Sequence, residues 1–367
     1  MKDTWPFTGS YKPDDVQFLL KPISLIDTPV HLKESLIQSG QKHYSEMLSH
    51  EALPSTDYLS LFYEAMVANQ DRMAEHLLLL AEGIIATRRH PITLVSLARA
   101  GTPIGVCLKH ILKRYFNIEA EHYSISILRD VGVDTNALRY ILKSHAPESL
   151  VFVDGWTGKG VIARQLANSL QAFAKSDGVH IVPELYVLTD LSGWAAVAAS
   201  TEDYLIPSCI LNATVSGLIS RSVYEKSTVS STDFHACLYY EHFASDDLST
   251  YFVDALLARV ALIRPVFTGT FIDHSSHCES LQAISEQLLT WVSERYGLSQ
   301  HNYIKPGIGE ATRVLLRREA AVLLLQDLHA DATQHLCWLA RSKSIPIEVF
   351  SDLPYRAVAL IKEIRHE

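Results

Sequence analysis

The residues LVFVDGWTGKGV, at positions 150–161, decide the fold because their composition changes character three times within twelve residues. Four apolar residues lead to the carboxylate of Asp154, and a stretch with three glycines follows it. Apolar residues then recur at helical spacing from Val161 to Leu170. These three patterns predict a buried strand that ends at Asp154, a tight loop, and an amphipathic helix.

The glycine-rich loop is a candidate phosphate site. Glycines before a helix leave unpaired N–H groups at the positive end of the helix dipole, so Gly158, Lys159 and Gly160 could surround a phosphate. The Walker A spacing does not fit, because a glycine follows Lys159 where Ser or Thr is needed. A dinucleotide-binding fingerprint fits loosely as Gly158-x-Gly160-x-x-Ala163, although the nearest strand-end acid, Asp190, comes later than expected. A Rossmann-type site stays open as an alternative.

A second strand, loop and helix precede this one in the chain. The apolar residues 92–97 predict a buried strand, residues 98–103 a tight loop, and residues 104–115 an amphipathic helix. The loop carries Arg99, whose guanidinium fork suits a pyrophosphate or another doubly charged group.

Further strands are predicted at 122–128, which leads to Arg129, at 185–190, which ends at Asp190, and at 204–212. Strands that alternate with helices at this spacing indicate a parallel α/β sheet, whose ligands bind at the carboxyl ends of the strands. Arg99, Asp154 and Asp190 all follow or end such strands, so we expect the site there.

The loop after Asp154 resembles the phosphoribosyl pyrophosphate (PRPP) loop of type I phosphoribosyltransferases, and the loop around Arg99 resembles their pyrophosphate loop. That family usually has two adjacent acids at the strand end, whereas Gly155 occupies the second place here. The resemblance implies an enzyme that binds PRPP with Mg²⁺, transfers the phosphoribosyl group to a base-like acceptor and releases pyrophosphate. It implies catalytic roles for Asp154, Arg99 and Arg129. The PRPP-binding residues that it implies are Ala100, Gly101, Thr102, Gly155, Thr157, Gly158, Lys159, Gly160 and Asp190.

The last part of the chain resembles a Pelota-type RNA-binding domain. A glycine turn near 303–309 is followed by a predicted strand at 321–325, a helix at 332–341, a strand at 345–350 and a closing helix to about residue 364. The resemblance implies a small α/β/α domain that contacts RNA. The residues expected to contact RNA are Lys305, Gly307, Glu310, Arg313 and Arg317.

The order of these parts resembles a bacterial family of phosphoribosyltransferase-like proteins with a C-terminal Pelota-type domain, associated with tellurite-resistance stress genes. Some of its members carry the label cysteine protease StiP. We therefore expect an N-terminal helical region at 1–89, a core at 90–300 with a hood over the acceptor at 226–300, and the Pelota-like domain at 301–367. Synthesis or salvage of a nucleoside-like stress metabolite is the implied role.

Two alternatives to a phosphoribosyltransferase stay open. The core could bind PRPP or a nucleotide without reacting it, as a sensor with an RNA-binding tail. The chain could also be a cysteine protease, for which a thiol needs a histidine within hydrogen-bond reach. Cys209 lies in an apolar run that predicts a strand, and folding would have to bring His235 or His242 beside it.

Composition limits the remaining possibilities. The chain of 367 residues has a net charge of −9, which argues against a wholly basic nucleic-acid binder. Its five cysteines are scattered, so reduced thiols are expected. Asp273, His274, His277 and Cys278 could ligate a metal, but a hood role is preferred for this region and no metal site is predicted. No signal peptide or membrane span is evident, so we expect a cytoplasmic protein that could form a homodimer.

Overall fold

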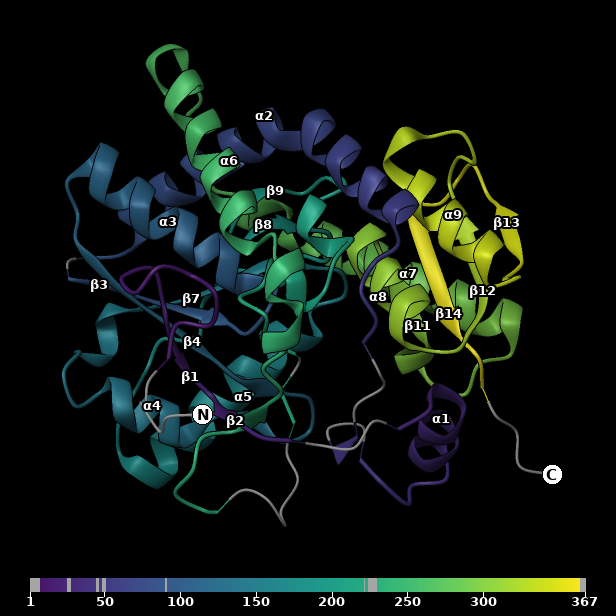
Figure 1. The fold of residues 1–367 in the computed structure, drawn as a ribbon, viewed down its shortest axis with the longest axis horizontal. Coiled ribbons are helices and arrows are strands. Elements are labelled where there is room, and N and C mark those ends of the chain that lie inside the picture. Colours follow the sequence, from purple (N-terminus) through teal and green to yellow (C-terminus); the bar gives the residue numbers. More distant parts are fainter. Residues whose placement is uncertain are drawn as a thin grey trace.

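A six-stranded parallel sheet forms the centre of the protein in the computed structural model, which describes residues 7–24, 28–43, 46–47, 51–89, 91–220, 222–223 and 230–363 (Figure 1). The strand order is β1-β4-β3-β7-β8-β9, and every neighbouring pair is parallel. The prediction of a parallel α/β sheet is confirmed. The strands are β1 (Gln17–Leu19), β3 (Ile92–Leu97), β4 (Ala120–Ile125), β7 (Leu150–Thr157), β8 (Leu185–Asp190) and β9 (Val197–Ser200).

The central strand β7 shows why this sequence forms a sheet that is covered on both faces. Val151 and Val153 belong to the apolar cluster on one face, and Phe152 belongs to the cluster on the other. The strand is longer than predicted, because Asp154, Trp156 and Thr157 continue its pairing with β8. The expected loop is therefore shortened to residues 158–160.

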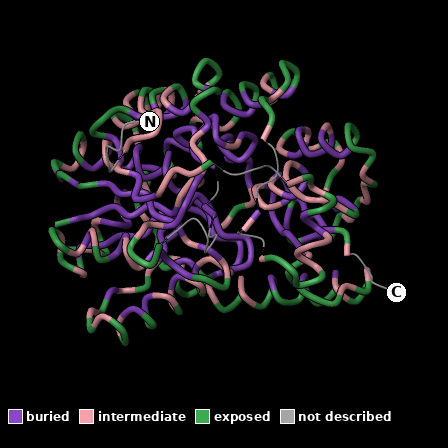
Figure 2. The backbone as a smooth tube through the Cα atoms, turned by 60° about the horizontal axis from the view of Figure 1, so that its bottom comes forward, coloured by how far each residue is buried: buried purple, intermediate pink, exposed green. Residues whose placement is uncertain are grey.

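Helices cover both faces of the sheet (Figure 1). One layer packs through the cluster that contains Val151, and the other packs through the cluster that contains Phe152. Figure 2 shows the buried residues concentrated between these layers. The first layer is α2 (Thr56–Thr87), α3 (Gly101–Phe116) and α6 (Ser249–Ile263), and the second is α4 (Thr135–Ile141) and α5 (Val161–Asp177).

The segment 204–212 differs from its prediction as a strand. The last strand of the sheet is β9 at 197–200, and Pro207–Cys209 form a short 3₁₀ helix beyond it. Proline has no N–H to give to a strand ladder, which favours this irregular path. The segment consequently lies beyond the carboxyl end of β9, where α/β proteins place their sites.

The C-terminal part is a second, four-stranded sheet of order β11-β14-β12-β13, covered by α7 on one face and by α8 and α9 on the other. The predicted closing helix is wrong: those residues form β14, a buried apolar strand between β11 and β12. The elements are α7 (Cys278–Tyr296), β11 (Ile304–Pro306), α8 (Ile308–Arg317), β12 (Ala320–Leu325), α9 (Gln334–Ser342), β13 (Ile347–Val349) and β14 (Ala357–Ile361).

Smaller elements complete the chain. A helix, α1 (Val30–Gln38), precedes α2, and two short sheets pair β2 (Lys21–Pro22) with β10 (Ala236–Cys237) and β5 (Ile127–Leu128) with β6 (Gly132–Val133). In the described part of the chain, further 3₁₀ helices span 147–149, 213–215, 241–246, 264–266, 275–277, 301–303 and 331–333.

The predicted three-part division of the chain stays a prediction. Within the first part, β1 pairs with β4 in the main sheet. Within the predicted hood, α6 packs against α2 and α3 as part of a core layer, and residues 224–229 lie outside the described ones. None of the helices in the described part of the chain is long and apolar enough to cross a bilayer.

Candidate active site

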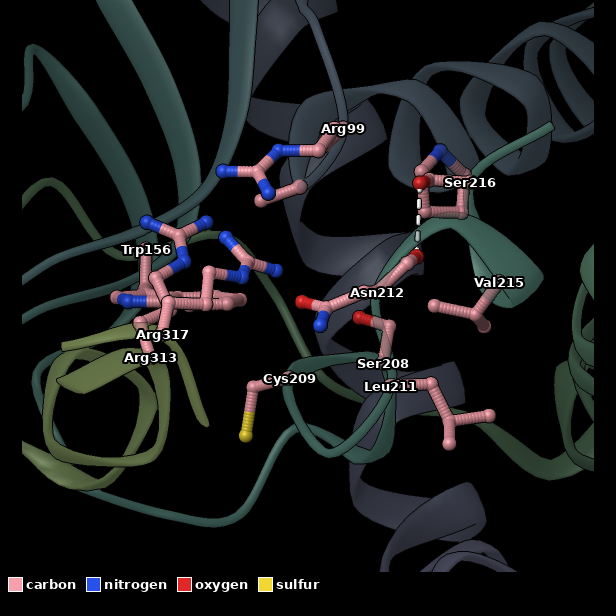
Figure 3. A pocket seen from close by; sticks show the side chains of 12 residues that line it. Arg99, Trp156, Ser208, Cys209, Leu211, Asn212, Val215, Ser216, Arg313 and Arg317 are labelled. Carbon is pink, nitrogen blue, oxygen red and sulfur yellow. Dashed lines mark hydrogen bonds between the residues drawn. The ribbon is translucent and has the colours of Figure 1, made fainter. Parts of the chain in front are cut away.

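A small pocket of about 20 Å³ lies where the loops beyond the sheet meet helix α8 (Figure 3). A volume of that size is enough for about one water molecule. It adjoins a larger groove of about 280 Å³, and the two share Arg99, Leu211, Asn212 and Arg317. The pocket is lined by Arg99, Ala100, Pro103, Trp156, Ser208, Cys209, Leu211, Asn212, Val215, Ser216, Arg313 and Arg317.

Close packing of backbone brings these loops together. Gly101 opens α3, and a Cβ placed on it would lie 2.3 Å from the carbonyl oxygen of Val153, so only glycine fits there. Arg99, two residues earlier, has a positive φ of 80°, which turns the chain sharply out of β3. The predicted convergence of the Arg99 loop with β7 is present, and both reach the pocket.

Cys209 is the cysteine that lines this pocket, at the end of the 3₁₀ helix Pro207–Cys209. Only 3% of the residue is exposed. Burial raises the pKa of the thiol to about 12, although its contact with Thr312 and the charge of Arg313 act in the opposite direction. Cys209 is therefore a neutral thiol at neutral pH.

A hydrogen-bonded chain joins Cys209 to a histidine of the C-terminal part. The thiol contacts the hydroxyl of Thr312 with 3.8 Å between Sγ and Oγ1, and Thr312 Oγ1 lies 2.8 Å from His335 Nε2. Burial lowers the pKa of His335 to about 3, so its imidazole is neutral. Its Nδ1 is buried without a hydrogen-bond partner among the described residues. Thr312 also donates to the Ile308 carbonyl when its hydroxyl turns that way, at 2.7 Å.

This pairing was not predicted. For the alternative of a cysteine protease, folding would have had to bring His235 or His242 beside Cys209. His235 Nδ1 is instead bonded to Ser126 Oγ at 2.8 Å, and the ring of His242 packs on Phe243 with 4.3 Å between centroids. No local pattern around His335 could have indicated its position, because it depends on how the two parts of the chain dock.

Arginines give the pocket its charge. The guanidinium of Arg313 lies over the Trp156 ring at 4.4 Å from its centroid, and its Nη1 donates to Glu310 at 2.8 Å. Figure 3 shows the guanidinium groups of Arg99, Arg313 and Arg317 gathered on one side of the pocket. Two of them come from α8, so the pocket needs both parts of the chain.

Asp154 lies beside this cluster, within β7. Its Oδ1 accepts a hydrogen bond from the Gly155 N–H at 2.8 Å. Burial raises its pKa to about 6, against the opposing effect of the Arg313 charge. Asp154 was predicted to end its strand, but β7 continues to Thr157, so the carboxylate lies within the strand.

The glycine loop of residues 158–160 is covered rather than open. A Cβ on Gly158 would lie 2.6 Å from the Pro306 carbonyl oxygen, and one on Gly160 would lie 2.2 Å from the Trp194 ring. Lys159 Nζ donates to two backbone carbonyls of the C-terminal part, those of His301 at 2.5 Å and Ile304 at 2.8 Å. The loop thus joins the two parts of the chain.

Burial also explains the altered acidity of this lysine. It lowers the pKa of Lys159 to about 7, and the nearby positive charge of Arg129 acts in the same direction. Arg129 therefore lies near the docking region, not in the pocket that Cys209 lines.

Three other predicted ligand residues serve the local fold. Thr157 Oγ1 accepts from the Gly160 N–H at 3.1 Å, and the Thr102 hydroxyl bonds to Ser124 at 2.8 Å. Asp190 accepts from the N–H groups of Ser192 and Ala195, at 2.8 and 2.7 Å, and so orders the turn after β8. Ala100 lines the pocket, and Gly155 packs against Ala100.

The residues expected to contact RNA face the core. Lys305 is 8% exposed, and a Cβ on Gly307 would lie 2.7 Å from the Leu191 side chain. Arg313 and Arg317 line the pocket, and Glu310 is paired with Arg313. Asp203 of the core accepts from the N–H groups of Ile308 and Arg356 at 3.0 and 2.9 Å, which fixes this docking.

The other four cysteines do not line this pocket. Cys107, Cys237 and Cys337 are buried outside the pocket, and Cys278 is half-buried at the start of α7. Burial raises the pKa of Cys278 as well. No group of three or more His, Cys, Asp or Glu side chains within the described ranges could hold a metal ion, and this includes 273–278.

The fold and the site define a two-part α/β protein with a cysteine and an arginine cluster in a pocket at the carboxyl edge of a parallel sheet. Residues 9–257 match the family described as tellurite-like stress resistance cysteine protease StiP. The chain belongs to that family. Residues 283–363 match the PELOTA RNA-binding domain.

A curated relative is the protein named cysteine protease StiP of Acinetobacter baylyi. It is 39% identical over 368 aligned residues, which span 98% of this chain and 95% of that protein. No solved structure matches the chain.

These matches correct the predicted function. The family and the relative are both named as cysteine proteases, so the main prediction of a phosphoribosyltransferase, a glycosyltransferase that consumes PRPP, is wrong. The structure agrees at one point: the glycine loop expected to surround a phosphate is covered by Pro306 and Trp194. The Mg²⁺ prediction was tied to PRPP and stays untested. The resemblances to the tellurite-resistance family and to the Pelota domain are confirmed.

Proposed function

We propose that this protein is a cysteine protease whose nucleophile is Cys209. One observation carries the choice of residue. Three of the cysteines lie within the family match at 9–257, and of these Cys209 is the one that lines the pocket described here. It is also the one that a hydrogen-bonded chain connects to a histidine.

In the proposed mechanism, the Cys209 sulfur attacks the carbonyl carbon of a peptide bond. Its proton passes to Thr312 Oγ1 while the Thr312 proton passes to His335 Nε2. The amine leaves with the proton from His335, and water hydrolyses the thioester that remains. The side-chain amide of Asn212, which lines the pocket, would donate to the oxyanion.

The acidities explain why the thiol rests unreactive. The pKa of Cys209 is about 12 and that of His335 about 3, a gap of about nine units. Burial therefore disfavours the thiolate–imidazolium pair that proton transfer would create in the described conformation. The transfer therefore has to accompany attack on a bound substrate, as it does for a serine hydroxyl, rather than precede it.

The test is digestion of a mixed peptide library, with mass-spectrometric detection of new termini. The wild-type protein and a Cys278→Ser control are expected to cleave, and Cys209→Ser is not. Cleavage that survives in Cys209→Ser, or no cleavage by the wild-type protein, would refute the proposal.

We also propose that the C-terminal domain binds RNA, on the ground of its match to the PELOTA RNA-binding domain. Because Lys305 and Arg313 face the core, the docked protein would have to use residues of the domain that stay exposed, such as Arg341 of α9. Fluorescence anisotropy with a structured RNA tests this. Arg341→Gln should weaken RNA binding and Lys305→Met should not. The reverse result would show that RNA binds the face of the domain that contacts the core in this structure.

A further inference from the structure

The pocket that Cys209 lines is too small for a substrate side chain, since its volume of about 20 Å³ has room for about one water molecule. A peptide on Cys209 must therefore place its side chains elsewhere. The groove of about 280 Å³ adjoins the pocket and shares Leu211 and Asn212 with it. Figure 3 shows Cys209, Leu211 and Asn212 along one segment of the chain. Ile210, the residue after Cys209, also lines the groove, so the wall of the groove starts beside the residue that carries the thiol.

Apolar side chains form most of this wall. They come from the N-terminal part of the chain, from the segment after Cys209 and from helices α8 and α9. Two aromatic rings of the wall, Tyr58 of α2 and Trp338 of α9, pack together with 5.3 Å between their centroids. Such a surface favours an apolar ligand, which leaves water when it binds. The apolar and aromatic lining residues are Val30, Ala52, Leu53, Pro54, Tyr58, Ile210, Leu211, Leu316, Trp338 and Leu339.

Several polar side chains of the groove already have partners in the fold. The Tyr58 hydroxyl donates to the Ile210 carbonyl at 2.9 Å. The Ser55 hydroxyl accepts from the Tyr58 N–H at 3.3 Å, and the Glu51 carboxylate accepts from the Ala213 N–H at 2.7 Å. Recognition in the groove therefore depends mainly on apolar contact. The basic residues of the lining also interact with other groups of the protein; they are Lys33, Arg99 and Arg317.

A polar atom that the groove shares with the pocket is left for a ligand. Asn212 Oδ1 is buried and has no hydrogen-bond partner among the described residues. Buried polar atoms without partners are uncommon, because each costs free energy. An amide oxygen accepts, so a peptide N–H would satisfy it, while Nδ2 of the same side chain would donate to the oxyanion. Such a bond would hold the main chain of a substrate beside Cys209, at the start of the groove.

We propose that the groove binds a bulky apolar side chain of the substrate, such as that of Leu, Met or Phe, close to the bond that Cys209 attacks. This rests on the proposed protease function, whose site the groove adjoins. The volume of about 280 Å³ lies just below the range of about 300–1,000 Å³ for small-molecule pockets, which suits one or two side chains rather than a folded partner. An extended peptide advances about 3.3 Å per residue, so the side chain that enters the groove belongs to a residue within about two positions of the bond that is cleaved.

Binding can be tested apart from hydrolysis by using the full-length Cys209→Ser protein. Matched short peptides, acetylated and amidated at their ends, carry Leu, Ser or Glu at one position among alanines. Calorimetric titration is expected to give a dissociation constant about tenfold to a hundredfold lower for the Leu peptide than for the Ser peptide, the range for burial of one Leu side chain. In the same background, Leu53→Ser should reduce this preference severalfold, because it removes part of the groove wall at a residue that is 41% exposed. The matched control Leu262→Ser, at a residue of α6 that is 67% exposed and does not line the groove, should preserve the preference.

Equal binding of the Leu and Ser peptides, or no binding of the Leu peptide, would overturn the inference. Tighter binding of the Glu peptide would also overturn it, in favour of recognition by the basic residues of the lining. The same holds if Leu53→Ser and Leu262→Ser reduce the preference equally. Selective binding of the Leu peptide without cleavage by the wild-type protein would support the groove as a peptide site and refute the protease function. Cleavage by the wild-type protein with equal binding of the Leu and Ser peptides would do the reverse, so the two failures are distinguishable.

Discussion

The rate at which Cys209 is alkylated should rise with pH, because burial keeps its thiol neutral at neutral pH. With a pKa of about 12, the thiolate fraction at pH 8 is about 10⁻⁴, whereas an ordinary thiol with a pKa of about 8.5 is about one-quarter ionised. Alkylation of Cys209 should therefore be at least about a thousandfold slower than that of a free cysteine at this pH. Its rate should rise about tenfold per pH unit from pH 7 to pH 10, because only the thiolate reacts.

The assay is timed labelling with iodoacetamide, quantified for each cysteine by mass spectrometry, with the half-buried Cys278 as an internal reference. A rate that levels off below pH 8 would show a low-pKa thiolate and refute the reasoning from burial. The same raised pKa makes the stability of the fold depend on pH. The neutral Cys209 thiol contributes its full share to the free energy of unfolding below its pKa in the unfolded chain, about 8.5. This contribution is lost as the pH rises toward about 12.

Three other predictions concern the site and the docking. Thr312→Val should abolish cleavage and lower the free energy of unfolding by about 1–3 kcal/mol, because His335 Nε2 loses its hydrogen bond. Thr312→Ser should retain both the cleavage activity and the stability. Equal activity of the two variants would exclude the proton path through Thr312. Asp154→Asn should raise the free energy of unfolding at pH 7 by up to about 3 kcal/mol. The pKa of the Asp154 carboxyl is raised to about 6, so its ionisation destabilises the wild-type fold as the pH rises from about 4 to 6, whereas Asn does not ionise. Thermal unfolding should therefore show the variant to be more stable than the wild-type protein at pH 7 but not at pH 4. Asp203→Ala should leave two buried N–H groups unpaired and cost about 2–4 kcal/mol in denaturant unfolding; an unchanged midpoint would show that this carboxylate does not hold the C-terminal part.

The strongly periodic segments could be predicted from the sequence. Residues 92–97 form β3 as predicted, and the helix after Gly160 begins at Val161. The apolar run at 92–97 fits a buried strand, and the apolar periodicity after Gly160 fits one buried face of a helix. The carboxyl edge of the sheet as the place of the site also follows from the alternation of strands and helices.

The chemistry could not be predicted in the same way. A glycine such as Gly158 indicates that something approaches the backbone closely, but not whether it is a phosphate or, as here, the Pro306 carbonyl. Lys159 next to it carries a charge that suits a phosphate and equally suits two carbonyl oxygens. Local sequence is the same in both cases, so the interpretation depended on contacts that only the docked fold supplies.

The position of Cys209 could not be predicted for a related reason. The apolar run around Cys209 predicts a strand, yet Pro207 starts a 3₁₀ helix there and puts the thiol in the pocket. Its partner His335 comes from the other part of the chain, through Thr312.

The central claim, that Cys209 is the nucleophile of a protease, is tested most directly by covalent trapping. The wild-type protein is incubated with a mixture of peptidyl chloromethyl ketones, and the modified residue is located by mass spectrometry. We expect a single adduct on Cys209, which forms in the Cys278→Ser control and is reduced in Thr312→Val. An adduct on Cys278, or equal labelling of several cysteines, would contradict it.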